Sequence, residues 1–197
     1  MTNPKTPLAE YKGIQIYSPE AVSTTLEYVG KDIEEVSEQE IEEKFEFIED
    51  ESLRRILIRD FLELETCKNR GLAKSTLVLC GSIIEALLLD QILKDENLSR
   101  AQERFNDIIR KKKPERVDTP PEKWWFAEII DVCEKLGLIS HEAKKEVWKL
   151  NDYRQIIHPT NEISMERNIT PELSHISYLI LSMIINDLKK KNLMIII

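Results

Sequence analysis

The chain has 197 residues, of which 42% are hydrophobic, 32% are charged and only five are glycine. This composition is typical of one globular, mostly helical domain that is long enough to bury a core. The formal net charge of −8 disfavours a protein that coats nucleic acid nonspecifically, because its long-range field repels a polyanion, but it is compatible with a small local anion site.

The sequence shows no clear membrane span, signal peptide or pair of closely spaced cysteines. No apolar run approaches the length of a membrane span, and the first twenty residues lack the layout of a signal peptide. The cysteines, Cys67, Cys80 and Cys133, lie far apart on or beside apolar helical faces. We therefore expect a cytoplasmic protein with reduced core thiols and no membrane partner.

The sequence offers no cofactor site. The histidines, His141, His158 and His175, show no metal-ligand spacing, and no carboxylate or thiol completes a set around them. A phosphate-binding glycine loop is also missing from the sequence. We expect no metal and no cofactor.

Residues 1–49 are interpreted as an N-terminal extension specific to this protein. Residues 14–16 alternate apolar and polar side chains, which predicts a short strand. Ser18 precedes a proline and predicts the start of a helix. Ser37 with Glu40 predicts a capping box ahead of a second short helix.

Residues 50–190 are predicted to form an all-α helical bundle. The helix expected over residues 74–95 is apolar around most of its circumference, which places it in the middle of the bundle. Ser82 and Glu85 interrupt this apolar surface one turn apart. Because an unpaired buried carboxylate is costly, we expect Glu85 to form an ion pair with Arg154.

A basic, proline-rich loop precedes the next helix, which is predicted over residues 122–136. It follows a helix expected to start at Ser99. Helical spacing assigns Trp125 to the apolar face and Trp124 to a polar face. One interpretation of this region is contact with RNA or a protein partner, and the alternative is a solvated loop with ordinary packing of the tryptophan. The residues concerned are Trp124, Lys111, Lys112 and Lys113.

The helix predicted to run from a cap at Ser140 to His158 carries the best candidate for chemistry. Arg154 stands on its apolar stripe where a leucine is expected, and Asn151 and His158 lie one turn before and after it, with Pro159 ending the helix. An imidazole that moves protons beside a guanidinium that holds anionic oxygens suits phosphate chemistry. The alternative is structural, with Arg154 as an ion-pair partner and His158 as a helix cap.

Three segments carry a resemblance to a known family: residues 77–89, residues 128–139 and the run from Asp152 to Pro159. Together they resemble the HEPN-like helical superfamily over roughly residues 50–190. Many HEPN proteins are metal-independent ribonucleases, often toxins or antiviral effectors, whose dimers bring the Arg and His motifs of two chains together.

The resemblance implies a homodimer that cleaves RNA, with Arg154, His158 and Asn151 as catalytic residues and Glu85 and Ser82 as their structural support. An antitoxin or another defence-system protein is the further partner that it implies. Three residues separate Arg154 from His158, whereas the family pattern has roughly four to six. The alternative function is a non-catalytic helical dimerisation or adaptor module in a larger assembly.

The C-terminal part is predicted to contain a polar connection over residues 160–169 and a final helix that starts at Thr170 and Pro171. Residues 191–197 form an apolar tail rich in isoleucine. Because an exposed apolar segment of this kind promotes association, we expect the tail to pair with the strand at residues 14–16 or to dock on a partner chain.

Overall fold

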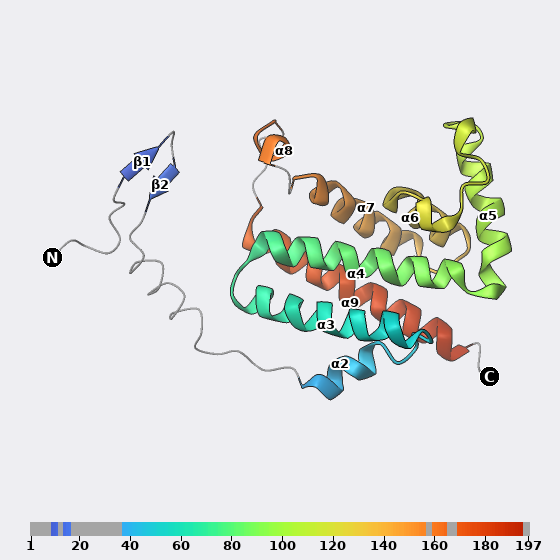
Figure 1. The fold of residues 1–197 in the computed structure, drawn as a ribbon, viewed down its shortest axis with the longest axis horizontal. Helices are drawn as coiled ribbons and strands as arrows, with labels where there is room; N and C mark the ends of the chain where they lie inside the picture. The colour runs from blue at the N-terminus through green and yellow to red at the C-terminus, as the bar shows by residue number, and fades with distance from the viewer. Residues whose placement is uncertain (1–8, 12–13, 17–36, 157–158, 165–168, 195–197) are drawn as a thin grey trace.

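The computed structural model describes residues 9–11, 14–16, 37–156, 159–164 and 169–194, and in these residues the chain is a helical bundle with one small hairpin (Figure 1). The predicted all-α class is confirmed. The elements are β1 (Ala9–Tyr11), β2 (Ile14–Ile16), α2 (Glu38–Lys44), α3 (Glu51–Asn69), α4 (Ala73–Leu93), α5 (Asp95–Ile109), the short 3₁₀ helices η1 (Pro114–Arg116) and η2 (Pro121–Lys123), α6 (Phe126–Lys135), α7 (His141–Ile156), α8 (Pro159–Ser164) and α9 (Pro171–Met194).

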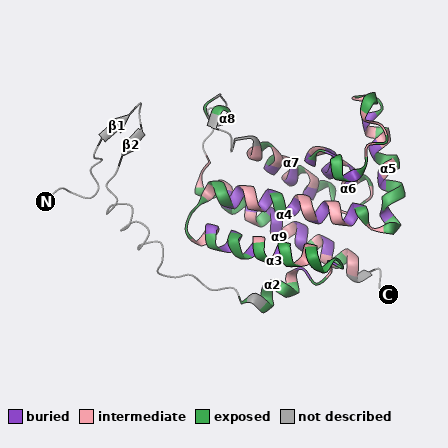
Figure 2. Ribbon diagram, in the orientation of Figure 1, coloured by how far each residue is buried: buried purple, intermediate pink, exposed green. Residues whose placement is uncertain are grey.

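Helix α4 is the centre of the bundle, as predicted. It packs against α3, α5, α6, α7 and α9, and many of its side chains are buried (Figure 2). Among the described residues it is also the one helix long and apolar enough to cross a membrane, with a mean hydropathy of 1.8. The expectation that no segment approaches a membrane span is therefore corrected, although the neighbouring helices account for its apolar surface.

Local capping signals determined where several helices begin. Ser37 and Glu40 form the predicted capping box at α2. The Ser140 hydroxyl accepts a hydrogen bond from the Ala143 N–H at the start of α7. The Thr170 hydroxyl accepts one from the Leu173 N–H at the start of α9. Such bonds satisfy N–H groups that lack a partner inside the helix.

Helix α5 begins at Asp95, four residues before the predicted start at Ser99. Lys94 has an extended backbone conformation, which ends α4 and separates it from α5. Asp95 and Glu96 then occupy the first turn, where their negative charge suits the helix dipole.

The predicted pairing of the two termini is wrong. Ile14–Ile16 is a strand, but it pairs antiparallel with Ala9–Tyr11, only two residues away. This hairpin closes a far shorter loop than a pairing with the C-terminus would, so it costs less chain entropy. Residues 191–194, assigned to the apolar tail, belong to the end of α9, and residues 195–197 lie outside the described residues.

Two further predictions concern Ser18 and the connection before α9. The helix start at Ser18 lies outside the described residues. The polar connection expected over residues 160–169 contains the short helix α8, which begins at Pro159. Proline is favoured in a first helical turn because its missing N–H would have no partner there.

The hydrophobic core begins inside the segment interpreted as an N-terminal extension. Ile41, Phe45 and Ile48 are completely buried and belong to the same core as the helices of the bundle. The Phe45 ring meets the Phe61 ring of α3 edge to face, with 5.7 Å between their centroids. The packing therefore does not divide at residue 49.

The three cysteines are buried and free, as predicted. Burial raises the pKa of the Cys80 thiol to about 12, and it raises the pKa values of Cys67 and Cys133 as well. These thiols are protonated at neutral pH, which makes them poor nucleophiles in the folded chain.

Candidate functional site

Arg154 lies at the end of an apolar stripe on α7. Ala143, Val147 and Leu150 of this stripe are completely buried, which fixes the face of α7 that meets the bundle. The side chain of Arg154 continues along that face and remains 26% exposed. Its Nη1 donates a hydrogen bond to Glu85 Oε2 at 2.7 Å, so the predicted ion pair between α7 and α4 is present.

Gly81 allows Arg154 to lie against α4. A Cβ atom at this position would stand 2.4 Å from Arg154 Cδ, far inside contact distance. The Arg154 guanidinium also lies over the Phe126 ring, 5.0 Å from the centroid. Sequence reasoning missed Gly81, although a glycine one turn before Glu85 in a strongly helical segment is a signal of close approach.

We expect Gly81→Ala to lower stability by about 1 kcal/mol, because overpacking against Arg154 costs about 1–3 kcal/mol and alanine returns about 1 kcal/mol of helix propensity. In an Arg154→Ala background the same change should raise stability by about 1 kcal/mol. Urea unfolding of the wild type, both single variants and the double variant measures this coupling. Additive effects would show that the Gly81–Arg154 contact is energetically unimportant.

Ser82 was expected to support the site from a buried position, and the structure does not place it there. It is exposed, and Glu85 on the same side of α4 is 34% exposed. The apolar composition of α4 hid the fact that one of its faces meets solvent. Arg154 and Glu85 therefore lie at the edge of the core and not inside it.

Of the two residues predicted to act with Arg154, the structure describes Asn151 but not His158. Asn151 is half-buried on α7, one turn before Arg154, and forms no side-chain hydrogen bond with another described residue. His158 lies outside the described residues, so its placement relative to Arg154 stays a prediction.

The two adjacent tryptophans have the opposite environments from those predicted. Trp124 is only 5% exposed, stacks on Phe105 at 4.3 Å between centroids, and donates its indole N–H to the Thr119 carbonyl. Trp125 is 53% exposed. The prediction failed because it extended helical spacing over residues 122–125, whereas α6 begins at Phe126 and both tryptophans are extended.

Trp125 lies among cations of the basic loop. The Arg116 guanidinium carbon lies 4.1 Å from the centroid of the indole, and Lys113 Nζ lies 3.3 Å from it. Arg116 is itself held by Glu128 Oε1 at 2.7 Å and by the Lys123 carbonyl at 2.9 Å. The remaining predicted contact residues, Lys111 and Lys112, are exposed in the same loop.

Phe126 links Arg154 to the start of α6. Phe126, which lies under the Arg154 guanidinium, follows Trp125 in the chain. Helix η2, just before the tryptophans, also packs on α4, which carries Glu85. Arg154 therefore contacts the buried residue that opens α6, whereas Lys113 and Arg116 contact the exposed Trp125 just before it.

A second polar group lies inside the bundle. The Tyr178 hydroxyl of α9 donates to Glu65 Oε1 of α3, and Lys68 forms an ion pair with the same carboxylate. Burial, followed by the hydrogen bond to Glu65, raises the pKa of Tyr178 above its ordinary value. This group joins α3 to α9 and is explained by packing.

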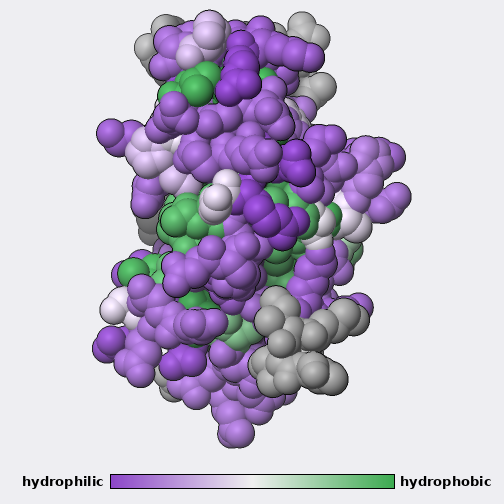
Figure 3. Space-filling model, turned by 90° about the vertical axis from the view of Figure 1, so that its right-hand side faces the viewer, coloured by the Kyte–Doolittle hydropathy of each residue, from purple (hydrophilic) through white to green (hydrophobic). Residues whose placement is uncertain are grey.

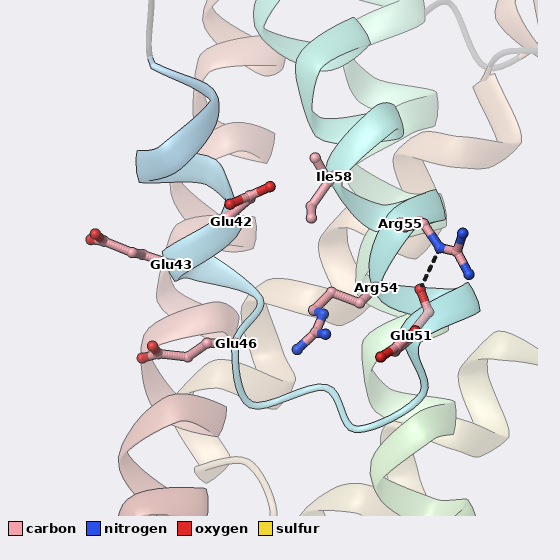
Figure 4. A pocket seen from close by; sticks show the side chains of 7 residues that line it. All are labelled: Glu42, Glu43, Glu46, Glu51, Arg54, Arg55 and Ile58. Atoms are coloured by element: carbon pink, nitrogen blue, oxygen red, sulfur yellow. Dashed lines mark hydrogen bonds between the residues drawn. The ribbon is translucent and has the colours of Figure 1, made fainter.

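The hollow drawn in Figure 4 lies between α2 and α3, with a volume of about 570 Å³. Glu42, Glu43 and Glu46 line it on one side, and Arg54 extends into it from α3 (Figure 4). Its acidic lining disfavours an RNA ligand. No residue of the predicted site lies here.

The described residues contain no group of three or more His, Cys, Asp or Glu side chains placed to hold a metal ion. Comparisons of the chain with protein-family models, with curated proteins and with solved structures gave no match.

Proposed function

We propose that this chain is a HEPN-like protein that cleaves RNA without a metal ion, as a homodimer in a toxin or antiviral defence system. The observation that carries the proposal is Arg154, whose guanidinium is partly exposed and held by Glu85 and Phe126 in an otherwise acidic protein. A phosphate oxygen is a ligand that such a positioned guanidinium attracts.

In the proposed reaction the ribose 2′-hydroxyl attacks the adjacent phosphorus, and the bond to the 5′-oxygen of the next nucleotide breaks. His158 removes or returns a proton, while Arg154 and Asn151 stabilise the negative charge on the phosphate. One chain supplies one such histidine, so a second copy related by a two-fold axis supplies the other proton-transfer group. The products are a 2′,3′-cyclic phosphate and a 5′-hydroxyl.

Glu85 fits this proposal as a positioning residue. It occupies Nη1 of Arg154, and a guanidinium has five N–H donors, so others remain for phosphate oxygens. The close contact with Gly81 and the ring of Phe126 restrict the guanidinium further. A group held in place before the reaction stabilises developing charge without reorganising.

The test is incubation of the purified chain with end-labelled single-stranded RNA in the presence of EDTA. We expect cleavage that leaves cyclic phosphate ends, and no cleavage of the same strand carrying 2′-O-methyl groups, because the attacking hydroxyl is blocked. Light scattering on the same sample measures whether the chain is dimeric. An intact RNA at concentrations where the chain is dimeric would contradict the proposal.

A second candidate is a non-catalytic dimerisation or adaptor module. The Glu85–Arg154 ion pair favours it, because the pair explains both residues as a link between α4 and α7. Exposed apolar side chains on α9, Ile176 and Leu179, are consistent with a protein partner. This candidate predicts that Arg154→Ala alters stability or assembly in a protein that never cleaves RNA.

A further inference from the structure

We propose that Trp125 and Lys113 form a contact site for single-stranded RNA, in which a base stacks on the indole and the neighbouring phosphate pairs with the ammonium group. The inference rests on the proposed function for the choice of RNA as ligand. It adds a substrate-binding site in the loop between α5 and α6, which lies outside the Arg154 to His158 motif.

Trp125 is exposed, and its indole contacts two cations of the loop. A large aromatic side chain normally buries its ring, as Trp124 does, yet more than half of Trp125 faces solvent. Its backbone N–H is bonded to Glu128 Oε2 at 2.8 Å, which fixes the residue at the start of α6. The indole is therefore presented to solvent from a fixed position.

The two cations at the ring differ in how they are held. Arg116 is fixed by Glu128 and the Lys123 carbonyl, and its side chain is only 15% exposed. Lys113 contacts the ring and forms no ion pair with another described residue. Lys113 is therefore free to leave the ring when a base arrives and to pair with the phosphate of that nucleotide, while Arg116 continues to hold the indole.

The local charge favours an anionic ligand at this place. Arg110, Lys111, Lys112 and Lys113 are consecutive where α5 ends, although the whole chain carries a net charge of −8. Figure 3 shows the side of the molecule that carries α5, and hydrophilic residues cover most of its upper end. Glu115, Asp118 and Glu122 follow in the same loop, so the cations that can attract a phosphate are gathered at its α5 end.

Single-stranded RNA fits this chemistry better than an acidic peptide or a duplex. A peptide carboxylate pairs with the lysines but leaves the indole uncovered. In a duplex the faces of the bases are already stacked on one another. An unstacked base with its phosphate uses both the aromatic face and the cation.

The experiment measures binding of the full chain to a fluorescein-labelled, single-stranded 2′-O-methyl oligonucleotide of mixed sequence, which binds but lacks the attacking hydroxyl. We expect Trp125→Ala to weaken binding by about 5- to 150-fold, the effect of losing one stacked base. Trp125→Phe should retain most of the affinity. Lys113→Glu should weaken binding and flatten its dependence on salt, with a slope lower by about 0.7 for each lost phosphate contact.

Lys145→Glu is the matched control, because Lys145 is an exposed lysine of α7 and the charge change is the same. Circular dichroism checks that each variant folds. If Trp125→Ala does not fold, the binding of the Lys113→Glu variant decides the test. Unchanged affinity in the folded Trp125 or Lys113 variants overturns the inference, as does equal affinity for a duplex or a preference for polyglutamate. Trp125-dependent binding without cleavage of natural RNA removes the nuclease proposal alone, whereas cleavage with unchanged binding in Trp125→Ala removes the contact site alone.

Discussion

Replacing His158 with alanine is expected to lower the rate of RNA cleavage by roughly 10²–10⁴-fold, the usual contribution of a general acid or base. Arg154→Ala is expected to lose roughly 10²–10³-fold, because the guanidinium stabilises charge that develops on the phosphate. Single-turnover cleavage of a labelled RNA measures both effects. The Arg154 variant should also lose about 1–2 kcal/mol of stability, since Glu85 loses its partner at a partly exposed position where solvent screens the charge.

Two controls separate chemistry from folding in this experiment. His175→Ala removes an exposed histidine near the start of α9, and we expect it to leave the rate unchanged. Arg154→Lys keeps the charge but loses the planar fork of donors, so its rate should stay well below that of the wild type. An active enzyme whose rate is the same in the His158 variant would contradict the proposed mechanism.

Phe45→Ala is expected to lower the free energy of unfolding by about 3–5 kcal/mol, the usual cost of removing a buried phenylalanine. Phe45 is completely buried and packs on Phe61, so alanine leaves a cavity between the segment after α2 and helix α3. Guanidinium unfolding followed by circular dichroism measures the change. The effect is large because residues 38–48 complete the core of the bundle.

Phe47→Ala is the matched control, because Phe47 is only partly buried two residues further along the chain. We expect its effect to be much smaller, since less apolar surface returns to water. A loss of under about 1 kcal/mol for Phe45→Ala would instead mean that the N-terminal segment is a separate appendage.

The placement of the tryptophans shows where prediction from the sequence stops. Helical spacing is reliable only after the first helical residue is known, because each residue changes the direction of a side chain by about 100°. Pro120 and Pro121 begin the short helix η2, and α6 starts only at Phe126. An error of a few residues in that start exchanged the buried Trp124 for the exposed Trp125.

Arg154 shows what the sequence and the structure each contribute to the candidate site. Its ion pair with Glu85 was predictable, because two charged residues that interrupt apolar surfaces each need a partner. Its contacts with Gly81 and Phe126 were not, because they depend on how closely α4, α6 and α7 approach. The pairing of β2 with β1 was not predictable either, because the sequence of a strand does not specify which segment it pairs with.

The sequence by itself determined the all-α class, the central position of α4, and the start of α2, α7 and α9. These features follow from caps and apolar periodicity, which act within a few residues of the chain. Only the tertiary structure decided that Phe45 belongs to the core, that Ser82 and Trp125 face solvent, and that Arg154 lies over Phe126. Those features depend on which helices lie side by side, and contacts between distant segments are set by the packing of the whole bundle.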